Sequence, residues 1–275
     1  MKKPKIQHYV PQFYLRAFAL KNSEQLFVLD KVNINIYPES ISKLCGQNYY
    51  YSYKENDCDA YNFIIEEYLS KKETQFSKVL SMIISGIDGY YYNSKDMKRI
   101  NHKEKIILFE FIYFQLMRVP KYLDKLFNQG VAFIKELNIK YNHFQSEKEI
   151  KNDIKKIWFP KLFDNVQEFI AIMNKRNLVF MIIDKNLDEY FISSDNPVIM
   201  LNSEISVERV GIVHPMTEIA IPISKNILLS IRETYIESRF EYNLITSKDN
   251  IKRINRLIKD NSVRFVYSCL ERLLI

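Results

Sequence analysis

The N-terminal sequence places three polar side chains, His8, Gln12 and Arg16, at intervals of four residues. Proline is favoured in the first turn of a helix, so we expect a short helix to begin near Pro11. Gln12 and Arg16 would then share one face and hold an anion together, and His8 would lie just before the helix, where an imidazole can titrate or bind a ligand. The alternative is structural: His8 stabilises the helix start and Arg16 pairs with a carboxylate.

Two acidic residues, Glu66 and Glu73, lie seven positions apart in a segment of helical periodicity. This spacing puts both carboxylates on one face of a helix, about 10 Å apart along its axis. A single cation between them would therefore need a ligand from another element. The alternative for either glutamate is a solvated position on the helix surface.

Gln115 and Arg118 stand three residues apart in a segment that is otherwise almost wholly apolar. A guanidinium is always charged, and its burial is costly unless a carboxylate or a phosphate meets it. Arg118 is therefore either the counter-ion of Glu66, Glu73 or Asp195, or a residue that binds an anion beside Gln115.

Asp195 and Asn196 precede Pro197 between two expected strands. Asp and Asn before Pro are typical of an ordinary β-turn, which is the structural interpretation. In the functional interpretation, the turn presents Asp195 to the helices that carry the two glutamates. Carboxylates with a histidine suit Mg²⁺ or Mn²⁺, and such an ion would activate water for phosphodiester hydrolysis.

The combined hypothesis is a metal-dependent hydrolase of the nuclease kind. The expected metal ligands are Glu66, Glu73 and Asp195, and the expected catalytic residues are His8, Glu73, Arg118 and Asp195, with Arg118 stabilising the developing phosphate charge. The expected substrate-binding residues are Gln12, Arg16, Gln115, Asn196, Lys252 and Arg256.

Four motifs carry a resemblance to a known family: HYVPQFYLR at 8–16, EEYLSKKE at 66–73, QLMRVP at 115–120 and ISSDNP at 192–197. In this order they resemble the bacterial domain-of-unknown-function family 4238, from residue 8 to about residue 224. Ala17 departs from the polar residue that the family leads us to expect there. The family name implies no reaction, so the resemblance supports the fold boundaries and the choice of site residues more than any chemistry.

Length and composition point to one continuous globular chain. Its 275 residues are 47% hydrophobic and include only 5 Gly and 8 Pro, so we expect a single domain over 1–275 with one substantial core. The three cysteines are far apart and match no zinc motif. There is neither a signal-peptide pattern nor an uncharged apolar run of about 18 residues, so we expect no membrane association and a cytoplasmic protein.

The charge balance is basic. Forty Lys and Arg against 33 Asp and Glu give a net charge of +7 and a pI near 9.0. Most of the excess is spread along the chain, as on a generally solvated surface. Residues 248–275 are the exception, because Lys252, Arg256 and Lys259 recur there at helical spacing. Such a basic stripe favours nucleic acid as a partner.

Hydrophobic periodicity predicts an α+β fold, in which a helical first half packs on a mostly antiparallel sheet formed largely by the second half. The helical region covers about 57–175, and Pro120 should kink or divide the apolar helical block over 103–137. The strand-rich region covers about 176–275, and an early strand at 25–32 is expected to join its sheet.

Three functions are compatible with these features. The first, favoured because one His, two acids, an Arg and an Asp-Asn pair occupy the motifs, is the metal-dependent nuclease, acting for example in bacterial defence. The second is a nucleic-acid or nucleotide-binding module without catalysis, contacting its ligand through Lys252, Arg256 and the aromatic run 49–51. The third is a protein-interaction component whose polar cluster only stabilises the core.

Overall fold

The computed structural model describes residues 4–55, 60–89, 100–140, 145–202, 212, 214–233 and 240–275. Most of the helices lie in the first two thirds of the chain, as predicted, and one further helix lies near the C-terminus. Their bounds are α1 Gln12–Arg16, α2 Ile64–Gly89, α3 His102–Met117, α4 Pro120–Lys140, α5 Glu147–Asp164, α6 Val166–Met173 and α8 Lys248–Asn261. Within the described ranges, no helix is long and apolar enough to cross a membrane.

Helix α3 is the central helix of the fold. It begins at a capping box in which the side chains of Asn101 and Glu104 each accept a backbone N–H from the other residue. Every residue from Leu108 to Leu116 is buried, so this helix is enclosed on all sides. It ends before Pro120, where α4 starts, because proline disfavours a helical conformation in the residue that precedes it. The predicted division at Pro120 is confirmed.

The strands form one large sheet and several smaller ones. Their bounds are β1 Ile6–His8, β2 Gln25–Asp30, β3 Asn35–Ser40, β4 Gly46–Asn48, β5 Tyr53–Lys54, β6 Tyr61–Asn62, β7 Asn177–Ile183, β8 Ser193–Ser194, β9 Ile199–Asn202, β10 Thr217–Ser224, β11 Ile227–Arg232, β12 Phe240–Ile245 and β13 Phe265–Ser268. The five-stranded sheet has the order β12-β7-β11-β10-β9, and only its β12–β7 pair is parallel. The α+β class is therefore confirmed.

The early strand belongs to a different sheet from the one expected. β2 lies in an antiparallel four-stranded sheet of order β3-β2-β13-β8, so it pairs with second-half strands but does not extend the five-stranded sheet. Its neighbour β13 comes from the far end of the chain. Local periodicity predicts that a strand forms but not which strand it pairs with, and this accounts for the error.

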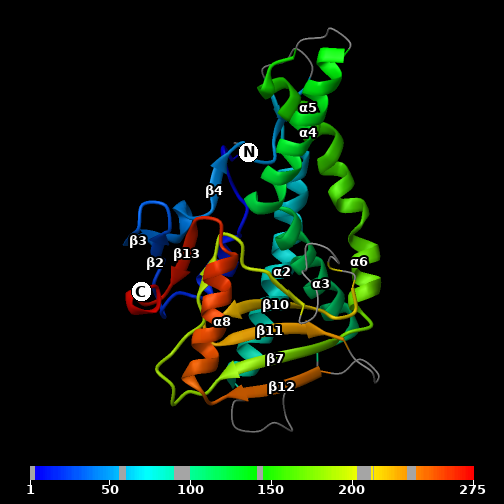
Figure 1. Ribbon diagram of the computed structural model, residues 1–275. Coiled ribbons are helices and arrows are strands. Elements are labelled where there is room, and N and C mark those ends of the chain that lie inside the picture. The colour runs from blue at the N-terminus through cyan, green and yellow to red at the C-terminus, as the bar shows by residue number, and fades with distance from the viewer. Residues whose placement is uncertain are drawn as a thin grey trace.

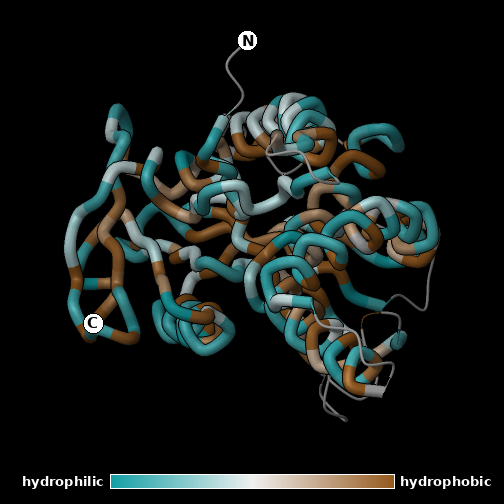
Figure 2. The backbone as a smooth tube through the Cα atoms, turned by 90° about the horizontal axis from the view of Figure 1, so that it is seen from above, coloured by the Kyte–Doolittle hydropathy of each residue, from teal (hydrophilic) through white to brown (hydrophobic). Residues whose placement is uncertain are grey.

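The five-stranded sheet lies between two hydrophobic cores, and successive side chains of each strand point alternately into one core and the other. On β10, Ile219 and Ile221 face the core that contains α2 and α3, whereas Ala220 faces the core beneath α8. Figure 1 shows α8 lying across one face of this sheet, with α2 and α3 behind it. In Figure 2 the tube of the helices alternates between teal and brown along its length, as expected for helices with one hydrophobic face. Both faces of the sheet are covered.

Candidate functional site

Arg118 is the centre of a buried polar network between α2 and α3. Its side chain is only 4% exposed, and its Nη1 donates to Glu73 Oε1 at 2.7 Å. Its Nη2 donates to Gln115 Oε1 at 3.1 Å, and Gln115 Nε2 donates in turn to the Tyr9 carbonyl at 3.1 Å. Of the two predicted roles for Arg118, the contacts match that of a counter-ion, with Glu73 as its partner. Its Nε has no hydrogen-bond partner in the described part of the chain.

Aromatic packing fixes this ion pair in place. Phe76 follows Glu73 by three residues and therefore lies on the same face of α2. Its ring packs against Phe111 at 5.6 Å and Phe114 at 5.9 Å between centroids, which holds α2 against α3. Arg118 is the C-cap of α3, one turn beyond Phe114. The two helices thus bring Glu73 and Arg118 together because their aromatic faces interlock.

Glu66 lies in the electrostatic environment of the same pair. Burial and, to a smaller extent, the charge of Glu73 raise the pKa of its carboxyl to about 7, although Arg118 opposes both effects. Tyr51 closes the other side of this region, with its hydroxyl 3.5 Å from the carbonyls of both His8 and Arg118. The carboxyl of Glu66 is therefore able to gain and lose a proton near neutral pH.

Asp195 is bound by backbone amides. Its carboxylate accepts N–H groups from Val263 at 2.8 Å, Arg264 at 2.7 Å and Phe265 at 2.9 Å. Burial raises the pKa of Asp195, and the three hydrogen bonds offset only part of this increase. Asn196 donates to the Asn261 carbonyl at 3.0 Å. Both residues therefore tie the turn after β8 to the segment from the end of α8 to the start of β13.

His8 and Arg16 form a separate polar line on the surface. His8 Nε2 lies 3.1 Å from the Ser42 carbonyl and 3.2 Å from Gln12 Nε2. Arg16 donates through Nη2 to Gln12 Oε1 at 3.2 Å and through Nε to both oxygens of Glu24, at 3.1 and 3.0 Å. Arg16 therefore pairs with a carboxylate, as the structural interpretation of this residue expected.

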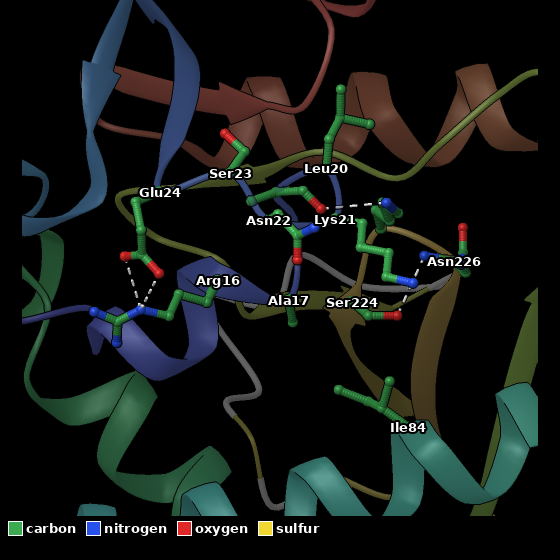
Figure 3. A pocket seen from close by; sticks show the side chains of 12 residues that line it. Arg16, Ala17, Leu20, Lys21, Asn22, Ser23, Glu24, Ile84, Ser224 and Asn226 are labelled. Carbon is green, nitrogen blue, oxygen red and sulfur yellow. Dashed lines mark hydrogen bonds and ion pairs between the residues drawn. The ribbon is translucent and has the colours of Figure 1, made fainter.

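Figure 3 shows Glu24 directed at Arg16 beside a pocket of about 400 Å³, with Ser224 and Asn226 of the β10–β11 turn on its other side. Sequence reasoning missed Glu24 as the partner of Arg16. Glu24 lies in the loop before β2, eight residues from Arg16, so no helical spacing indicates the contact.

The predicted site residues therefore fall into three groups. The structure brings Glu66, Glu73, Gln115 and Arg118 together. The side chains of Asp195 and Asn196, and those of His8, Gln12 and Arg16, make their contacts elsewhere, although the His8 backbone carbonyl lies near this group through Tyr51. Among the described residues, no three His, Cys, Asp or Glu side chains are grouped so that they could hold a metal ion.

Helix α8 carries the basic stripe. Its apolar side chains Ile251, Ile254 and Ile258 are buried against the sheets. Lys252, Arg253 and Arg256 point outward and are exposed. Lys259, the third member of the predicted stripe, instead donates from its Nζ to the Leu274 carbonyl at 2.9 Å.

The fold and these contacts define an α+β protein in which a glutamate–arginine ion pair links helices α2 and α3. Residues 6–271 match the family model described as "Protein of unknown function (DUF4238)", so the chain belongs to this family. The match extends beyond residue 224, and it therefore corrects the expected extent by including α8 and β13. No curated protein and no solved structure matches the chain.

Proposed function

We propose that the protein is a nucleic-acid-binding module and that the outer face of α8 contacts the phosphate backbone. The observation that carries the proposal is a set of exposed cations on one helix. Lys248, Lys252, Arg253 and Arg256 are exposed, and no described carboxylate forms an ion pair with any of them. These cations outnumber the two exposed carboxylates of α8, Asp249 and Asp260, and a basic face of this kind is what a polyanion neutralises on binding.

The geometry of α8 suits an extended ligand. Steps of four residues from Lys248 to Lys252 to Arg256 place successive cations about 6 Å apart along the helix axis. The opposite face is fixed by burial, and Asn255 locks it further by donating to the Tyr190 carbonyl at 2.8 Å and accepting from the Ile192 amide at 3.1 Å. The basic face is therefore presented on a rigid support, at a low entropic cost of binding.

Contacts of the predicted catalytic residues support binding over hydrolysis. The metal-dependent alternative needs Asp195 as a ligand beside Glu66 and Glu73, but both Asp195 oxygens accept backbone N–H groups. Arg118, which was to meet the phosphate, is engaged by Glu73. We place the protein in the cytoplasm, where nucleic acids are accessible and where buried thiols such as Cys45 and Cys269 stay reduced.

The test is a salt titration of binding. Fluorescence anisotropy with a labelled DNA duplex and a labelled RNA strand, between about 50 and 200 mM salt, gives the slope of log K against log salt concentration. We expect K252Q/R253Q/R256Q to reduce the magnitude of the duplex slope by about 2 to 3. Binding of the unchanged protein should survive EDTA.

A matched control removes the same charge elsewhere. Lys78, Lys103 and Lys125 are exposed on α2, α3 and α4, and their triple glutamine variant should leave the slope within error of the unchanged protein. Equal slopes for the two triple variants would refute the role of α8. Cleavage of the probe that requires Mg²⁺ and is lost in Asp195→Ala would favour the hydrolase instead.

A further inference from the structure

A second site that goes beyond the proposed function lies between the segment after β4 and the α4–α5 hairpin, which projects at the top of Figure 1. The cleft has a volume of about 1170 Å³, and its lining residues come from other elements than α8. Asn152 of α5 holds one wall to the other, because it accepts the Lys54 amide at 2.6 Å and donates to the Lys54 carbonyl at 2.8 Å.

Lys155 lines this cleft as a partly buried cation that pairs with no carboxylate among the described residues. Its Nζ donates to two neutral acceptors, the carbonyls of Tyr49 at 3.1 Å and Ser52 at 3.3 Å. In the part of the chain that the structure describes, no carboxylate lies within ion-pair distance of this Nζ. Burial lowers the pKa of Lys155 to about 8, as expected for an ammonium that lacks a compensating charge.

Most of the acidic groups of the cleft have partners of their own, and the remaining one, Asp124, has its pKa raised by burial and lowered by the charge of Lys151. Glu147 pairs with Lys151 at 2.8 Å and with Lys135 at 3.3 Å. Asp153 accepts from Gln145 Nε2 at 3.2 Å and lies 3.9 Å from Lys156 Nζ. Glu147 and Asp153 are therefore already engaged, whereas no carboxylate of the described residues pairs with Lys155.

The wall beside Lys155 is aromatic and conformationally constrained. Tyr49 adopts a φ of 53°, in the left-handed region that favours glycine, and presents its carbonyl to Lys155. Its ring stacks on that of Tyr61, with centroids 3.9 Å apart and planes 2° from parallel. Next to it the buried hydroxyl of Tyr50 has no hydrogen-bond partner among the described residues. A cation, flat apolar rings and an unused polar group thus line one cleft.

We propose that this cleft binds a small anionic ligand whose phosphate or carboxylate group meets Lys155 Nζ and whose ring or apolar body lies against Tyr49 and Tyr61. The anion supplies the missing counter-charge, and the third N–H of the ammonium remains to bind it. The cleft, at about 1170 Å³, is somewhat larger than the roughly 300 to 1,000 Å³ that is typical of small-molecule sites, so a ligand of this size fits in it.

Isothermal titration calorimetry with four probes tests the proposal: inorganic phosphate, adenosine monophosphate, benzoate and uncharged adenosine. We expect at least one of the anions to bind, and adenosine to bind at least about tenfold more weakly than its monophosphate if the phosphate is the group recognised. Benzoate as the best ligand would identify a carboxylate site. If none of the anions binds at millimolar concentration, the proposal is overturned.

Variants locate the site. Lys155→Met, which keeps an unbranched side chain of similar size without the charge, should weaken anion binding at least about tenfold. Lys148→Met, at an exposed lysine of the same cleft, should change it less than about twofold. Lys155→Arg keeps the charge and should retain binding.

Because Lys155→Met could also disturb the fold, the unchanged protein provides a second measurement. A bound anion should slow acetylation of Lys155 relative to Lys148 in peptide mass spectrometry. Equal protection of both lysines, or equal anion affinity of the Lys155→Met variant and the unchanged protein, contradicts the assignment.

Discussion

Replacing Glu66 with glutamine should stabilise the protein at alkaline pH and leave its stability unchanged in acid. Burial raises the pKa of this carboxyl from 4.5 to about 7 in the folded state. Between these values the folded state binds more protons than the unfolded state, so the free energy of unfolding falls as the pH rises from about 4.5 to about 7. Glutamine carries no proton to lose, so Glu66→Gln removes this loss.

The magnitude follows from the size of the shift. One pKa unit corresponds to about 1.4 kcal/mol, so the full shift would be worth about 3 kcal/mol. Solvent screens the Glu66 carboxyl, which is only partly buried, and we reduce the expected gain to about 1 to 2 kcal/mol at pH 8. For a chain of this length such a gain raises Tm by a few degrees.

Thermal unfolding followed by circular dichroism, at about pH 5 and about pH 8, measures the effect. Glu136→Gln, at an exposed position on α4, is the control and should change Tm little at either pH. Most of the Glu66→Gln gain should be present at the higher pH. An equal difference from the unchanged protein at both pH values would refute the reasoning, because it would show that no proton is involved.

Two further predictions concern the other predicted catalytic residues. Arg118→Met leaves the Glu73 carboxylate without its buried partner and should lower the free energy of unfolding, measured in urea, by about 2 to 4 kcal/mol. The same substitution should cost less when Glu73→Gln is already present, whereas purely additive losses would argue against coupling between the two residues. Asp195→Ala leaves three backbone N–H groups without an acceptor and should cost about 2 to 4 kcal/mol in guanidinium chloride, whereas unchanged stability would mean that these hydrogen bonds do not hold the turn.

Local features of the sequence determined most of the secondary structure. Neighbouring residues alone specify several features: the apolar periodicity of α2 and α3, the break at Pro120, and the short apolar runs of β7, β10 and β11. These features can be predicted without knowledge of the fold. The same locality explains the basic face of α8, because residues four apart share a helix face whatever the helix packs against.

Partners distant in sequence were decided only by the tertiary structure. The sequence requires that a buried Arg118 meet an anion, but three carboxylates satisfied that requirement equally, and the packing of Phe76 on α3 selects Glu73. Likewise, Asp195 accepts hydrogen bonds from residues at and just before the start of β13, and β2 pairs with β13. In both cases a long stretch of chain separates the two partners. Burial makes a polar group need a partner, and only the packing of whole elements determines which partner is within reach.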